Sequence, residues 1–282
     1  MNYLQRQRLR LHAAAARLWP RQQADNSCVR LGGLEFRSPL GAAAGLDRHG
    51  RLLASFDKLG FGFVEVGTIN NHSDAPVTAR RLSRWLRKRH GKPPMRIGIS
   101  IGSLRSYLDA MAINECVMLA QMFAPLADYI VLNLSRPRSP VRTGHFEPQH
   151  LQAVLQRVRA GCTANNPGTA PPLLVKIAIT PGCRDAYPPG VMQLFENHCD
   201  GIVVAFEDWP SVTAAAGWLR GRRPVLPVIA VGGIRHATDI DTYLAAGAAL
   251  VGVHRAIRSG HGLYSLIQYP SRRRHNGVDL GQ

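Results

Sequence analysis

The sequence predicts a single (β/α)8 TIM barrel, and three observations lead to that fold class. The chain has 282 residues, 45% of them hydrophobic, which suits one α/β barrel with a large core. Short apolar runs alternate with helical patterns, which favours a closed parallel barrel over a doubly wound sheet. The last two runs end in Gly232-Gly233 and His254-Arg255, where such barrels commonly bind a phosphate. The eight strands are expected at residues 39–44, 63–68, 97–101, 129–134, 173–177, 201–206, 227–231 and 249–253.

The barrel is expected to occupy residues 29–268, between two basic segments. Residues 1–28 contain a basic, partly amphipathic helix candidate, which could cap the fold or lie on a membrane surface. Residues 29–36 alternate around two glycines and predict a hairpin that plugs the amino-terminal end of the strands. The basic, polar tail at 269–282 is expected to be poorly ordered.

Helical patterns between the runs are expected near residues 49–59, 105–124 and 147–160. The basic stretch at 73–92 is open to two interpretations, an irregular lid or a short helix over 80–89 with a solvated charged face.

The formal net charge of +17 favours anionic partners. The arginines are spread along the chain, with clusters at 80–92 and 272–274, and they are not interleaved with aromatic residues. The sequence therefore does not favour a nucleic-acid partner. A genome biased towards arginine is a better explanation of the charge than specific nucleic-acid binding.

The cysteines and the hydropathy indicate a cytoplasmic protein. The five cysteines are widely spaced with no CxxC pair, so neither a disulfide framework nor a metal site is expected. No apolar run is long enough for a membrane-spanning helix, and the apolar part of the amino-terminal segment is too short for a signal peptide. Through that basic segment, the protein could still lie peripherally on the inner membrane face.

Lys176 is the most informative residue at the strand ends. It interrupts the run Leu-Leu-Val-Lys-Ile-Ala, where its ammonium would be buried unless it meets an anion or an acceptor. A lysine inside a barrel forms a Schiff base or neutralises charge on a cofactor such as a reduced flavin. The bland alternative is a lysine that reaches past the strand end into water. Asn133 also sits in an apolar run and needs partners.

The two glycines after the seventh run predict a tight turn before a helix. Gly232 and Gly233 would let the backbone approach a ligand. The free N–H groups and dipole of the following helix would favour an anion such as phosphate. A turn without a ligand is the alternative.

Three strand-end segments carry a resemblance: GAAAGLDRHG at 41–50, LGFGFVEVGT at 59–68 and DYIVLNLSRP at 128–137. These three segments resemble motifs of the dihydroorotate dehydrogenases in order and spacing, and so do the segments at 172–178, 200–203 and 226–234. The resemblance extends over about residues 29–267. The basic amino-terminal segment looks like a shortened form of the extension in the quinone-using, membrane-associated class.

The resemblance implies an FMN-binding barrel. The positions that match the family's flavin site are Ala43, Ala44, Gly45, Thr68, Ser100, Asn133 and Lys176, with Gly232, Gly233, His254 and Arg255 at the phosphate.

The substrate side departs from the family. Arg48 stands where the family has lysine, Ser100 where it has asparagine, and Arg136 where the quinone class has its catalytic serine. Arg138 also replaces an asparagine, and Glu207 lies in a segment that replaces Thr-Asn-Thr. The family's Asn-Arg-Met-Gly-Phe-Asn-Asn loop is absent, and residues 208–223 are too short for its usual excursion.

These departures predict a more anionic ligand than dihydroorotate. A guanidinium cannot act as a base near neutral pH, so Arg136 and Arg138 are expected to bind a carboxylate or phosphate. A solvated basic loop is the alternative. Arg48, Asn133 and Glu207 complete the expected substrate site. A general base, if one is needed, could be Ser135, His145 or His72, and the catalytic candidates are Lys176, Ser135 and Arg136.

The leading hypothesis is an FMN-dependent oxidoreductase that transfers a hydride from a small anionic substrate to FMN. A quinone or another external acceptor would reoxidise the flavin. Dihydroorotate itself is not the expected substrate, and an accessory or specialised-metabolism enzyme fits the rewritten pocket. A homodimer is possible. A second hypothesis is a relative without redox activity, in which Lys176 is a base or Schiff-base lysine or the barrel binds a partner. A third is a basic scaffold that binds nucleic acid or acidic lipid through residues 80–92.

Overall fold

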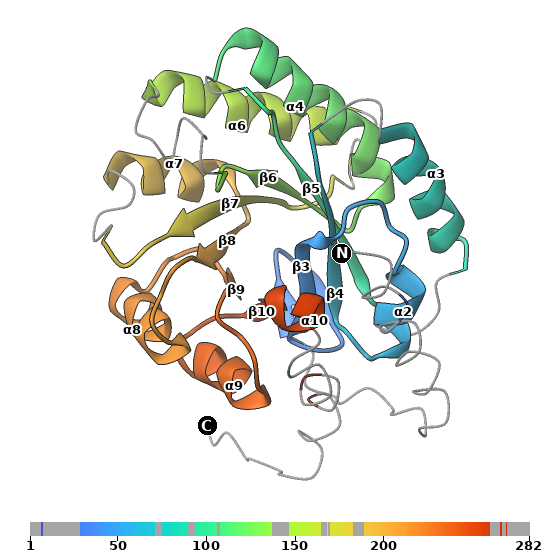
Figure 1. Cartoon of the computed structure of the whole chain (residues 1–282). Helices are drawn as coiled ribbons and strands as arrows, with labels where there is room; N and C mark the ends of the chain where they lie inside the picture. The colour runs from blue at the N-terminus through green and yellow to red at the C-terminus, as the bar shows by residue number, and fades with distance from the viewer. Residues whose placement is uncertain are drawn as a thin grey trace.

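Eight parallel strands close into a barrel with helices around it, which confirms the predicted fold class (Figure 1). The computed structural model describes residues 29–70, 75–88, 94–105, 108–136, 147–164, 168, 170–182 and 189–259, with Gln7, Leu266 and Tyr269 beyond them. The barrel strands are β3 (Leu40–Asp47), β4 (Phe63–Ile69), β5 (Arg96–Ile101), β6 (Tyr129–Asn133), β7 (Leu173–Ile179), β8 (Gly201–Phe206), β9 (Val228–Val231) and β10 (Leu250–Val253).

The helices follow the strands in alternation and form the outer ring (Figure 1). The neighbours α4 and α6 pack side by side, as do α8 and α9. The helices are α2 (Leu53–Lys58), α3 (Ala75–Leu86), α4 (Ala110–Phe123), the 3-10 turn η2 (Ala124–Leu126), α6 (Pro148–Thr163), α7 (Pro189–His198), α8 (Val212–Arg222), α9 (Ala237–Ala245) and α10 (Arg255–Ser259).

Two expected helices begin later than predicted, because side chains hold the preceding loops. The Asp47 carboxylate accepts the N–H groups of Arg51 and Leu52 at 2.8 and 2.7 Å, so α2 starts only at Leu53. The Asp109 side chain caps α4 by accepting the Ala112 N–H at 2.7 Å. The stretch at 73–92 is helical over Ala75–Leu86, in agreement with the helical interpretation.

The predicted hairpin forms and closes the amino-terminal end of the barrel. The strands β1 (Val29–Leu31) and β2 (Leu34–Phe36) pair antiparallel. The fully buried Phe36 ring meets the rings of Phe63 and Tyr129 edge-on, at centroid distances of 6.1 and 6.3 Å. Both of these rings belong to the first residues of barrel strands, so the hairpin plugs the end opposite the strands' carboxyl termini.

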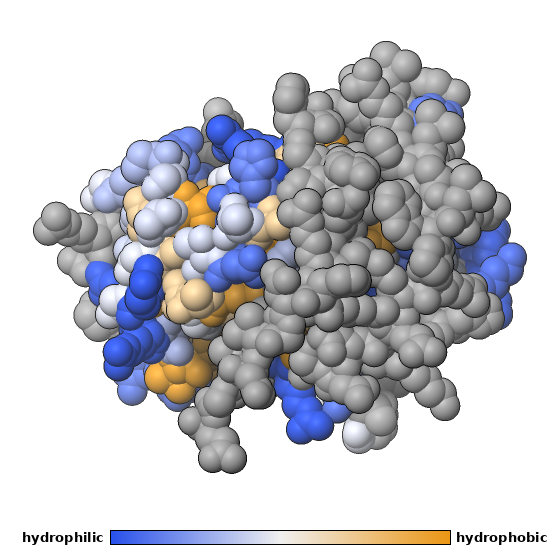
Figure 2. Space-filling model, turned by 90° about the horizontal axis from the view of Figure 1, so that it is seen from below, coloured by the Kyte–Doolittle hydropathy of each residue, from blue (hydrophilic) through white to orange (hydrophobic). Residues whose placement is uncertain are grey.

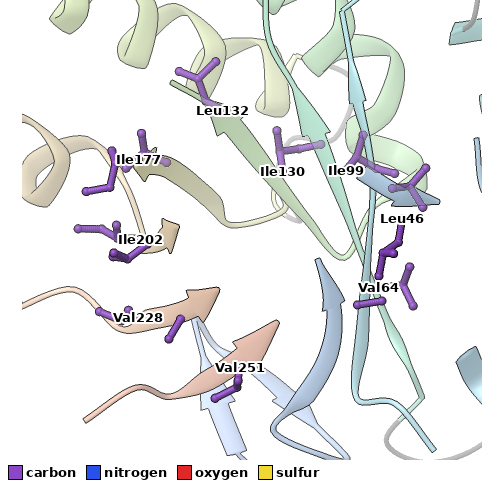
Figure 3. Close-up of a cluster of buried hydrophobic side chains, with 14 of the residues drawn as sticks. Leu46, Val64, Ile99, Ile130, Leu132, Ile177, Ile202, Val228 and Val251 are labelled. Atoms are coloured by element: carbon purple, nitrogen blue, oxygen red, sulfur yellow. The ribbon is translucent and has the colours of Figure 1, made fainter. Parts of the chain in front are cut away.

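A second, larger core lies between the strands and the surrounding helices. Figure 3 shows side chains of this layer, among them Val64, Ile130 and Val251. Alternate residues point inward, because successive side chains of a strand face opposite sides. Val131, Leu174 and their inward neighbours form the separate interior cluster.

The barrel closes between its first and last strands. Strand β10 lies between β9 and β3, and the register pairs Val251 with Leu40 and Val253 with Ala42. The β3–β4 ladder shifts register between Ala42 and Asp47, so β3 bulges where its carboxyl end approaches the site.

The flanking segments lie largely outside the described residues, including the proposed amino-terminal helix. Tyr269, the first residue of the expected tail, is 3% exposed, and its hydroxyl donates to Asp241 at 2.8 Å. On the described part of the face in Figure 2, hydrophilic residues surround separate hydrophobic areas. Within the described residues, no helix has the length and apolarity needed to cross a membrane.

Candidate functional site

Small residues line the carboxyl end of the barrel where β3 meets β10. Gly45 has a φ of 100°, and a Cβ there would lie 2.9 Å from Nε2 of His254. Ala43 is buried beside it, Ala44 is half-buried, and Gly45 is exposed. Since a larger side chain would fill this space, the segment presents bare backbone at the strand ends.

The turn after β9 requires glycine. Gly232 has a φ of 129°, and a Cβ on it would lie 2.2 Å from the carbonyl oxygen of Phe206. Gly233 has a φ of 70° and is exposed. Both conformations disfavour a residue with a side chain, so the backbone of this turn stays accessible.

Two aromatic residues, Tyr243 and Phe206, support the Gly232-Gly233 turn. The Tyr243 hydroxyl donates to the carbonyl oxygen of Gly232 at 3.1 Å. The Tyr243 ring stacks on Phe206, with centroids 5.4 Å apart and an interplanar angle of 21°. Tyr243 therefore fixes the turn from α9, and Phe206 fixes it from β8.

The helix that follows the turn satisfies two N–H groups just before its first residue from within the chain. The Asp239 carboxylate accepts the N–H groups of Arg235 and His236 at 2.7 and 2.8 Å. It belongs to a capping box at the start of α9. Both of these N–H groups precede Ala237, the first residue of α9, so the expected anion contact by the N–H groups of the helix and by the two glycines stays a prediction.

Lys176 is buried, as its sequence context predicted. The residue is 7% exposed on β7, next to Asn133 of β6 in the strand register. Among the described residues, no acceptor lies within hydrogen-bonding distance of its ammonium, and Glu65 is its charged neighbour. A largely buried lysine at the strand ends favours an anionic partner at that place.

Glu65 faces Lys176 from β4 and is fully buried. Its Oε2 accepts the N–H of Ala44 at 3.1 Å, and its Oε1 has no hydrogen-bond partner. Burial raises the pKa of the Glu65 carboxyl, and the nearby charge of Lys176 opposes that rise.

A chain of hydrogen bonds crosses β6, β4 and β5. The Ser135 hydroxyl donates to Oδ1 of Asn133 at 2.7 Å, and Nδ2 of Asn133 donates to Oγ1 of Thr68 at 2.6 Å. Oγ1 of Thr68 lies 3.0 Å from Oγ of Ser100. Ser100 is fully buried behind Thr68, whereas Thr68 and Asn133 are half-buried. Ser100 therefore orients Thr68, and the Asn133 amide has one fixed orientation.

Two arginines approach each other above these strands. The half-buried Arg136 follows β6, and its Nη1 donates to the carbonyl oxygen of Ser103 at 2.5 Å. Burial lowers the pKa of Arg136, and the positive charge of Arg48 lowers it further. Within the described residues, neither arginine has a carboxylate partner.

The remaining predicted residues are distributed around this site. Glu207 is half-buried after β8, and its N–H donates to the carbonyl oxygen of Ile179 at 3.0 Å. His254 is half-buried and Arg255 is exposed after β10. Arg138, His145 and His72 lie outside the described residues. No group of three metal-binding side chains occurs among the residues that the structure describes.

Sequence comparison identifies relatives along most of the chain, although no family model matches it. The dihydroorotate dehydrogenase (quinone) of Leifsonia xyli subsp. xyli is 32% identical over 275 residues, which cover 78% of this chain and 77% of the relative. The enzyme of that name from Kineococcus radiotolerans is 31% identical, with coverage of 81% and 76%. The chain belongs to the dihydroorotate dehydrogenase family. A solved structure of DHODH from Eimeria tenella with ferulenol has the same fold, with a TM-score of 0.74 at 22% identity, and covers 98% of this chain and 92% of its own.

Two residues of the site, Glu65 and Tyr243, were not predicted from the sequence. Glu65 could have been predicted, because it interrupts the apolar run Phe-Val-Glu-Val just as Lys176 interrupts its own run. The role of Tyr243 could not be predicted from the sequence, because a tyrosine in a helix is indistinguishable from an ordinary core residue until the partner of its hydroxyl is known.

Proposed function

We propose that the protein is an FMN-dependent oxidoreductase that takes a hydride from a small anionic substrate. The observation that carries the proposal is the buried residue Lys176, to which the described residues offer no hydrogen-bond acceptor, beside a segment of bare backbone at 43–45. Membership of the dihydroorotate dehydrogenase family supports it. When bound, FMN would accept the hydride and pass the electrons to a quinone, the acceptor in the relatives' names.

The residues around the site fit a flavin phosphate and ring. The turn at Gly232-Gly233 and the backbone at His254-Arg255 would hold the phosphate, with Arg255 adding a charge-assisted contact. Thr68 and Asn133 would donate or accept hydrogen bonds at the ring, since they are the half-buried members of the hydrogen-bond chain. Ala43, Ala44 and Gly45 would contribute backbone contacts.

Arg48 and Arg136 would bind the anionic group of the substrate. Arg48 is exposed and Arg136 is half-buried, so solvent screens part of their mutual repulsion, and an anion bound between them would remove the rest. Arg136 is held by Ser103, so part of its guanidinium is fixed before the substrate arrives. Arg138 and Glu207 complete the proposed substrate site. Ser135 would keep the Asn133 amide in place, and dihydroorotate is not the substrate we propose.

The visible absorbance spectrum of the purified protein tests this proposal. We expect a flavin spectrum with about one FMN per chain, bleached by a chemical reductant and restored by a quinone. Gly232→Ala should lower the flavin content, because its Cβ would collide with Phe206. Gly217→Ala is the matched control, since a Cβ there meets nothing within 4 Å. A colourless, folded protein that takes up no added FMN would contradict the proposal.

A further inference from the structure

Glu65 stands inside the barrel at a position where a carboxylate is costly. It is 0% exposed, and one of its two oxygens has no hydrogen-bond donor. Ionised carboxylates at such depth require a nearby cation or several donors. Among the residues that the structure describes, Glu65 has one donor, the N–H of Ala44, and one charged neighbour of opposite sign, Lys176. The residue thus connects two parts of the proposed flavin site.

The first connection is to the backbone of β3. The β3–β4 ladder loses its regular register between Ala42 and Asp47, and Ala44 lies within this bulge. Its N–H binds the Glu65 side chain, at the point where regular pairing with β4 is interrupted. The carboxylate therefore holds the bulge that presents residues 43–45 at the carboxyl end of the barrel.

The second connection is to the charge of Lys176. Glu65 and Lys176 each lie two residues after an inward-facing residue of β4 and β7, Phe63 and Leu174, so both side chains are on the interior side of the barrel. The charge of Lys176 acts on Glu65, although no ion pair within 4.0 Å joins them. Besides Lys176, the titratable group that faces Glu65 among the described residues is the phenol of Tyr129 on β6. The burial and the negative charge of Glu65 raise the pKa of that phenol, so it stays neutral. Lys176 is thus the neighbour that compensates the carboxylate charge.

We propose that Glu65 is a positioning residue that places a negative charge near the Lys176 ammonium and holds the Ala44 N–H in place, so that both are ready to bind the cofactor. The cofactor part of this inference rests on the proposed function. The coupling between Glu65 and Lys176 does not, because it is a property of the folded chain. It can therefore be tested by stability as well as by flavin binding.

The test is a double-mutant cycle of Glu65→Gln and Lys176→Met in the full-length protein, followed by thermal unfolding between about pH 6 and about pH 9. Lys176→Met leaves the Glu65 carboxyl buried without its cation. A buried carboxyl with a raised pKa binds its proton more tightly in the folded state, so stability falls as the pH rises. We expect the melting temperature of Lys176→Met to fall by about 5 °C or more over this range, relative to the parent protein.

Adding Glu65→Gln to Lys176→Met should abolish this extra pH dependence and raise the melting temperature at about pH 9. The matched control is the exposed pair Arg30 and Glu35, whose side chains are 77% and 43% exposed. The cycle of Glu35→Gln and Arg30→Met should show no coupling, because exposed ion pairs contribute little.

Flavin binding is the second readout. We expect Glu65→Gln to raise the FMN dissociation constant about fivefold or more in the parent protein and to have a smaller effect in the Lys176→Met background, where only the contact with the Ala44 N–H is altered. Equal effects in both backgrounds, together with a double variant no more stable than Lys176→Met, would overturn the inference. A Lys176→Met chain that folds only with Glu65→Gln present would support it, whereas failure of both chains to fold would count against it. A parent protein that binds no FMN would refute the proposed function, and the stability cycle would still decide the coupling.

Discussion

At the scale of single residues, the site is defined by charges that the protein leaves uncompensated. Within the part of the chain that the structure describes, Lys176 has no acceptor and one oxygen of Glu65 has no donor. Arg136 lies near Arg48, and no described carboxylate pairs with either arginine. Each arrangement costs stability in the isolated chain, and a ligand of the right charge recovers that cost. These residues therefore define the ligand chemistry more closely than the fold does.

Replacing either arginine should weaken the binding of anions. We expect Arg136→Ala and Arg48→Ala each to raise the dissociation constant of a dicarboxylate such as fumarate about tenfold, since a charge-assisted hydrogen bond contributes about 1.5–3 kcal/mol. Binding can be followed by the change in flavin absorbance. Arg220→Ala, on the exposed face of α8, is the control and should behave as the parent. An unchanged constant in Arg136→Ala would exclude the arginine pair as the anion site.

At the scale of elements, the barrel strands place the candidate site residues at their carboxyl ends, and the helices connect one strand to the next. The strand positions were predicted closely, because each buried strand appears as a short apolar run. Helix starts were predicted less well, since Asp109 and Asp47 act through side-chain hydrogen bonds that hydrophobic spacing does not reveal. The self-capping of α9 by Asp239 was missed for the same reason.

Removing the link between α9 and the glycine turn should loosen the phosphate contact. We expect Tyr243→Phe to raise the FMN dissociation constant about fivefold, because a hydrogen bond contributes about 1 kcal/mol. Equilibrium titration of the flavin-free protein measures it.

Tyr129→Phe is the matched control for that change. It removes a buried hydroxyl that has no hydrogen-bond partner, so neither stability nor FMN affinity should fall. Equal losses in the two variants would mean that the Tyr243 hydroxyl has no particular role at the turn.

At the scale of the whole molecule, the fold could be predicted and the site only partly. The spacing of apolar residues shows which segments are buried, and the order of these buried segments predicts the barrel. The glycine turn, Lys176 and Asn133 were predictable because they interrupt apolar runs at strand ends. The Glu65–Lys176 neighbourhood and the approach of Arg48 to Arg136 were not, since both join strands that are not adjacent in the barrel.

The packing of the whole barrel also predicts the reactivity of its thiols. Cys116, Cys162 and Cys199 are buried, and burial raises their pKa values to about 12, about 11 and about 12. At about pH 8 the folded protein should therefore protect all three from alkylation, because the thiolate is the reactive form. Mass spectrometry of labelled peptides, with and without denaturant, measures this. Labelling of any of the three at the unfolded rate would contradict the packing.

The pairing of β3 with β10 also has a consequence for protein synthesis. Leu40 pairs with Val251, so during translation β3 leaves the ribosome long before its last neighbour exists. Until β10 is made, β3 keeps one unpaired edge, and such edges recruit strands from other chains. Nascent chains that stall before residue 250 should therefore depend on chaperones, whereas release of the last barrel strand lets the sheet close on itself.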